Sequence, residues 1–112
     1  MNVFYIHFHA MELEERMAAM TARGWTVRGH STVGERALIG DPLPDALLLS
    51  LDRVPSHSYA YADWFWQAKK RQSIPIVFIG GTEKTVESAR TRYPDAHFSS
   101  FEELPNLMES IK

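Results

Sequence analysis

The chain has 112 residues, which predicts a single domain over residues 1–112. Hydrophobic residues make up 45% of it and aromatic residues 12%, a composition that excludes a disordered chain. The formal net charge is −2 and cysteine is absent, so we expect no nucleic-acid partner, no disulfide and no thiolate metal site. The start of the sequence lacks a signal-peptide pattern, and no apolar stretch is long enough to span a bilayer. We therefore expect a cytoplasmic protein with no membrane partner.

The first part of the chain alternates between strand-like and helix-like patterns. Residues 2–8 are mostly β-branched and aromatic, which is typical of a buried strand. From Met11 apolar residues recur at helical spacing until Gly24, a residue type that commonly ends a helix. Residues 25–31 alternate like a half-buried strand, and residues 33–39 allow a short helix.

The second part repeats this alternation with clearer strands. Residues 46–51 form an apolar run typical of a buried strand, and a helix is expected over 58–71. The apolar run 74-IPIVFIGG-81 predicts the next strand and ends in two glycines. Residues 83–93 predict a helix capped by the preceding threonine, and residues 96–99 predict a short fifth strand.

The last helix has two candidate starting points. Ser100 and Glu103 have capping-box spacing, whereas Pro105 suits the first helical position. In sum, five strands alternate with about five helices. Strands that are continuously apolar are buried on both faces, which predicts a parallel sheet between two helix layers. We therefore expect a three-layer α/β/α sandwich with strand order 2-1-3-4-5.

This pattern resembles the receiver domains of two-component response regulators, which have a flavodoxin-like fold. The resemblance covers nearly the whole chain and rests on 45-DALLLS-50 before a proline-containing loop, on 74-IPIVFIGG-81 and on 94-PDAHF-98. It implies a phosphorylation site at the carboxyl ends of the strands. In such a site two acids hold magnesium, an aspartate accepts the phosphoryl group, and a Thr or Ser and a lysine contact the phosphate.

The receiver side chains are missing at the matching positions of this sequence. The acid pair falls on His7 and Phe8, and the phosphoacceptor falls on Ser50. The Thr or Ser position falls on Gly80, and the lysine position falls around Ser100, where no lysine occurs. The resemblance therefore implies a pseudo-receiver, with the fold kept and the phosphotransfer chemistry lost.

Asp52 leaves an alternative open. It lies two residues after Ser50, so both side chains point the same way on an extended strand. The proline that follows is at the wrong distance from either residue, and Asp52 alone would bind magnesium poorly. A receiver phosphorylated at Asp52 is nevertheless an alternative to the pseudo-receiver.

Several histidines fall at or just after the carboxyl ends of predicted strands, where open α/β sheets bind ligands. His7, His9 and His57 could supply three imidazole ligands to a metal ion. The competing interpretation is that they are ordinary solvated loop histidines, and we expect no metal or other cofactor. Binding of a small ligand or metal at this edge is a second alternative function.

Aromatic residues suggest where a protein partner could bind. On the expected helix after residue 58, Trp66 falls outward together with Tyr59, although Trp66 could instead fold over a neighbouring loop. In ordinary receivers the last helices and strand carry output contacts, and the matching region here contains Tyr93, His97 and Phe101. We therefore expect a non-enzymatic, stand-alone pseudo-receiver that binds a signalling protein or associates with itself.

Overall fold

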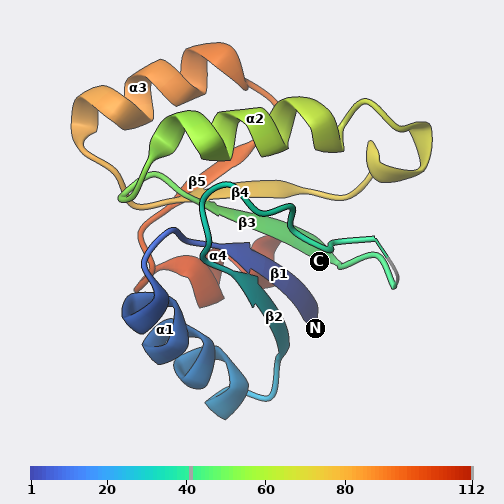
Figure 1. Cartoon of the computed structure of the whole chain (residues 1–112), viewed down its shortest axis with the longest axis vertical. Helices are drawn as coiled ribbons and strands as arrows, with labels where there is room; N and C mark the ends of the chain where they lie inside the picture. The colour runs from blue at the N-terminus through green and yellow to red at the C-terminus, as the bar shows by residue number, and fades with distance from the viewer. Residues whose placement is uncertain (41, 112) are drawn as a thin grey trace.

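The computed structural model describes residues 1–40 and 42–111 and contains one parallel five-stranded sheet of order β2-β1-β3-β4-β5 (Figure 1). The predicted α/β fold and strand order are confirmed. The strands are β1 (Asn2–Ile6), β2 (Thr26–His30), β3 (Ala46–Ser50), β4 (Ile76–Ile79) and β5 (His97–Ser99). The helices are α1 (Ala10–Ala22), α2 (Pro55–Phe65), α3 (Glu83–Arg92) and α4 (Leu104–Ser110). Among the helices described, none is long and apolar enough to cross a membrane.

The sheet is buried on both faces, with two helices on each (Figure 1). Alternate residues of β1 point to opposite layers: Val3 and Tyr5 pack toward α1 and α4, whereas Phe4 and Ile6 pack toward α2 and α3. Every residue of β3 and β4 is buried, as their continuous apolar runs predict. This packing fixes the register of the strands, and because all of the strands are parallel their carboxyl ends lie at one edge.

The expectation of about five helices is wrong, because residues 33–39 are not helical in the structure. Ala37 and Ile39 are buried, at 5% and 1% exposure, whereas Leu38 between them is 83% exposed. That two-residue alternation belongs to an extended segment rather than to a helix. The segment packs against α2, where the backbone N–H of Ala37 donates to the Tyr61 hydroxyl at 3.0 Å.

Helix α2 also differs from its expected bounds of 58–71. It begins at Pro55, a residue suited to the first turn because it has no N–H to leave unpaired. It ends at Phe65, and the Arg71 guanidinium donates to the carbonyls of Phe65 at 2.6 Å and Trp64 at 3.1 Å. Capping of the last carbonyls by Arg71 lets the chain turn into a short 3-10 helix, Lys69–Arg71.

Helix α4 begins at Leu104, between the two candidate starts. The Ser100 hydroxyl accepts a hydrogen bond from the Glu103 N–H at 3.1 Å, so it satisfies a backbone donor just before the helix. Pro105 then lies in the first turn.

Candidate functional site

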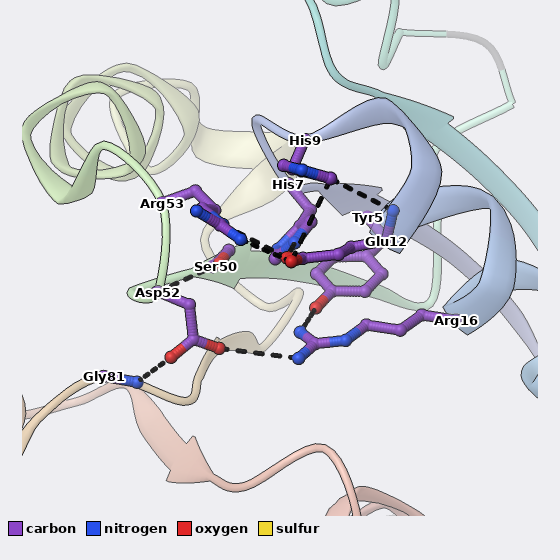
Figure 2. A network of polar contacts seen from close by, with 9 residues as sticks. All are labelled: Tyr5, His7, His9, Glu12, Arg16, Ser50, Asp52, Arg53 and Gly81. Carbon is purple, nitrogen blue, oxygen red and sulfur yellow. Dashed lines mark hydrogen bonds and ion pairs between the residues drawn. The ribbon is translucent and has the colours of Figure 1, made fainter.

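The carboxyl ends of β1, β3 and β4 meet at one edge of the sheet, together with the first turns of α1 (Figure 2). We call this region the carboxyl edge; its polar side chains come from Tyr5 and His7, Glu12 and Arg16, and Ser50, Asp52 and Arg53. His7, Ser50, Asp52 and Gly80, singled out from the sequence, all lie here. The structure adds Glu12, Arg16 and Arg53, which sequence reasoning missed.

Arg16 connects β1 to the loop after β3. Its Nη1 donates to the Tyr5 hydroxyl at 2.6 Å, and its Nη2 lies 3.6 Å from Oδ2 of Asp52. The guanidinium carbon also lies 5.0 Å from the centre of the Phe101 ring, a cation–π distance. Burial raises the pKa of Tyr5 to about 12, so the hydroxyl stays neutral and accepts from Arg16.

Asp52 is held by both of its oxygens. Oδ1 accepts from the backbone N–H of Gly81 at 2.8 Å, while Oδ2 faces Arg16. Gly80, at φ +79°, makes this approach possible, because a Cβ there would lie 2.1 Å from Oδ2 of Asp52. The Asp52 side chain is 37% exposed, so solvent reaches it from one side. Asp52 thus joins the loops after β3 and β4.

Ser50 has a structural role at the end of β3. It is fully buried, and its hydroxyl accepts from the backbone N–H of Asp52 at 3.1 Å. Its carbonyl accepts from the hydroxyl of Ser58 in α2 at 2.6 Å. At the position where a receiver carries its phosphoacceptor, this chain therefore has a neutral side chain committed to shaping the loop.

The second charged group of the carboxyl edge joins His7, Glu12 and Arg53. Nε2 of the fully buried His7 lies 2.8 Å from Oε1 of Glu12, so Nε2 carries the proton that this carboxylate accepts. Nε of Arg53 donates to the same oxygen at 3.1 Å, and Nη2 donates to Oε2. Hydrogen bonds from Arg53 and His7 hold the pKa of Glu12 at about 2, while burial lowers the pKa of His7.

Each of the three candidate metal ligands makes contacts with other side chains or with the backbone. His7 binds Glu12, whereas Nδ1 of His9 accepts from the Glu12 N–H at 3.3 Å and caps α1. The ring of His57 lies edge-on to Phe8, 5.4 Å between centres. Within residues 1–40 and 42–111 no group of three or more His, Asp or Glu side chains is placed to hold a metal ion. Magnesium would also have to displace a guanidinium from either carboxylate.

The candidate interface aromatics are more enclosed than expected. The outward orientation expected for Trp66 is wrong: its side chain is half-buried and its Nε1 donates to the carbonyl of Ile74 at 2.9 Å, so it covers the neighbouring loop. Trp66 directly follows Phe65, the last residue of α2, and its side chain lies against the loop that leads to Ile74. Trp66 and His97, which are far apart in sequence, line one surface hollow of about 440 Å³.

Tyr59 and Tyr93 pack on each other, with ring centres 5.7 Å apart. Tyr93 is only 8% exposed and its hydroxyl donates to Oδ1 of Asp63 at 2.6 Å, which ties α3 to α2. Burial and this hydrogen bond raise the pKa of Tyr93 to about 12. Phe101 is half-buried beneath Arg16.

What the carboxyl edge can do follows from its charges. Two carboxylates, Glu12 and Asp52, face two guanidinium groups, Arg53 and Arg16, so the cluster is neutral as it stands. It links β1, α1 and the loops after β3 and β4 without help from a ligand.

Neither the family models nor the curated proteins compared with this chain gave a match.

Proposed function

We propose that this chain is a pseudo-receiver, a protein-interaction module that works without phosphorylation in a signalling or regulatory system. The observation that carries the proposal is the internal pairing of the carboxyl edge. Arg16 and Arg53 supply, from within the chain, the positive charge that a metal ion and a lysine supply in a receiver.

The same pairing argues against phosphoryl transfer at Asp52. An acceptor carboxylate needs an oxygen open to the incoming phosphoryl group and a cation that both groups can share. Here Oδ1 holds the Gly81 N–H and Oδ2 faces both Arg16 and the Gly80 backbone. Phosphorylation would have to break the contacts that join these loops.

A receiver phosphorylated at Asp52 is the competing candidate, and one observation favours it. The Asp52 side chain is 37% exposed, and the Gly81 N–H beside it is a type of donor that also binds phosphate oxygens. The two candidates differ in what beryllofluoride, a phosphoryl mimic, does to the protein.

The deciding experiment is a backbone amide NMR titration with magnesium, followed by magnesium with beryllofluoride. We expect no saturable shift of the amides of Ser50, Asp52, Gly80 and Gly81. Asp52→Asn serves as the matched control, because it removes the acceptor charge at nearly constant size. Saturable shifts in the wild-type protein that disappear in Asp52→Asn would refute the proposal and identify Asp52 as a phosphoacceptor.

A further inference from the structure

A surface hollow lies where the expected helix is missing. It has a volume of about 310 Å³ and is lined by Arg36, Ala37, Ala60, Tyr61 and Trp64. Its walls are the irregular segment 31–40 and helix α2, which lie against each other (Figure 1). We call it the loop–helix hollow.

Hydrogen bonds hold the two walls of the loop–helix hollow together. The Tyr61 hydroxyl accepts from the Ala37 N–H at 3.0 Å and donates to the carbonyl of Glu35 at 3.3 Å, which fixes the segment on α2. In the same segment Leu38 is 83% exposed and Val33 is 51% exposed. Exposed apolar side chains therefore lie in the segment that forms one wall of the hollow, next to the exposed Glu35 and Arg36.

Two arginines add positive charge around this apolar surface. The guanidinium carbon of Arg71 lies 4.2 Å from the centre of the Trp64 ring, and that of Arg36 lies 6.0 Å from it. Across residues 1–40 and 42–111, neither arginine is within ion-pair distance of a carboxylate. Lys69 and Lys70, both exposed, directly precede Arg71 in the chain. Together with Arg36 these residues form a local positive cluster, although the formal net charge of the whole chain is −2.

We propose that the loop–helix hollow docks an acidic segment of a partner protein. Apolar side chains of that segment enter the hollow against Trp64 and Tyr61, and its carboxylates pair with Arg36 and Arg71. Guanidinium groups bind carboxylates well when they are already held on an aromatic face, because less side-chain freedom is lost on binding. This inference rests on the proposed interaction function and names the class of partner.

A second copy of this chain fits the hollow less well. A two-fold symmetric contact places the same surface patch on both subunits, so Arg36 and Arg71 would face a patch of the same charge. Like charges brought together in an interface cost binding energy. The positive patch instead matches a segment rich in Asp and Glu.

The test begins with a library of random peptides displayed on phage and selected on the immobilised protein. We expect the enriched peptides to combine acidic with aromatic or aliphatic residues. The best of them, made synthetically, is then titrated into labelled protein while the Trp64 indole Nε1–H signal is followed by NMR. Saturable movement of that signal places the peptide at the hollow.

Arg36→Glu is the decisive variant, because Arg36 donates no hydrogen bond and forms no ion pair within the part of the chain that the structure describes. We expect it to weaken peptide binding roughly tenfold or more, as the loss and reversal of a contacting charge does. The matched control is Arg23→Glu, at the end of α1 on the other side of the sheet, which should change affinity less than about twofold because of screening.

Any of the following results would overturn the inference: no enriched peptide, enrichment without an excess of acidic residues, or equal binding to wild type and Arg36→Glu. Peptides that move amides only within residues 82–111 would also overturn it while leaving an interaction module in place. The beryllofluoride titration tests the proposed function separately, so the two ideas fail in different experiments.

Discussion

Replacing Arg16 measures how far the carboxyl edge depends on its internal cation. In Arg16→Met the buried Tyr5 hydroxyl loses its partner, which costs about 1–3 kcal/mol. Loss of the Phe101 contact adds about 0.5–1 kcal/mol. The ion pair with Asp52 adds at most about 1 kcal/mol, because that carboxylate is 37% exposed and screened by water. We expect the free energy of unfolding to fall by about 2–4 kcal/mol.

The Tyr5→Phe variant separates the hydroxyl from the other contacts. In the Arg16→Met background it removes the group left without a partner, so about 1–2 kcal/mol should be regained. In the wild-type background it should instead destabilise the protein. Urea unfolding followed by tryptophan fluorescence at neutral pH measures all four proteins, with Arg23→Met as an exposed control expected within about 0.5 kcal/mol of wild type. Equal losses from Tyr5→Phe in both backgrounds would show that the hydroxyl and Arg16 are not coupled.

Two further predictions concern the same edge. Gly80→Ala should lower the free energy of unfolding by about 2–4 kcal/mol, because the new methyl group meets Asp52 and the residue has a positive φ. The control is Gly34→Ala, which has a φ of +89° but open space around it and should cost only about 1–2 kcal/mol. Equal costs of the two variants in urea unfolding would show that the Asp52 contact plays no part. Burial lowers the pKa of His7, so below its ordinary value of 6.5 the unfolded chain binds a proton that the folded chain does not, and stability should fall as pH falls. His7→Gln keeps a donor for Glu12 and should flatten this fall below about pH 6.5 in urea unfolding at stepped pH. The later loss from the lowered Glu12 pKa, between 4.5 and about 2, remains; unchanged slopes would contradict the assignment.

The sheet could be predicted from the sequence because its signals are local. β3 is apolar up to Ser50 and β4 is apolar throughout, and the glycines after β4 mark its end. Residues 33–39 were ambiguous for a physical reason: Val33 and Ala37 have helical spacing, whereas Ala37 and Ile39 have strand spacing. Only packing on α2, through a hydrogen bond between residues 24 apart, decides between them.

The carboxyl edge was harder to predict, because its charged contacts join distant parts of the chain. The acid pair expected directly after the first strand is absent, and Glu12 instead reaches His7 from the first turn of α1. Arg53 contacts Glu12 across 41 residues, a pairing that no local pattern signals. One signal was available: Glu12 and Arg16 are spaced i, i+4, so they share a face of the helix that begins at this edge.

Arginines have opposite roles at the carboxyl edge and at the loop–helix hollow. At the carboxyl edge, Arg16 and Arg53 meet carboxylates of the same chain, so the edge is neutral and its loops are tied together without a ligand. At the loop–helix hollow, Arg36 and Arg71 lie on Trp64 and contact no carboxylate within the described residues. If the hollow binds an acidic segment as proposed, the affinity should depend on the charge of that segment and on ionic strength. The affinity should not depend on whether Asp52 is phosphorylated, because Asp52 already contacts Gly81 and Arg16 in the free protein.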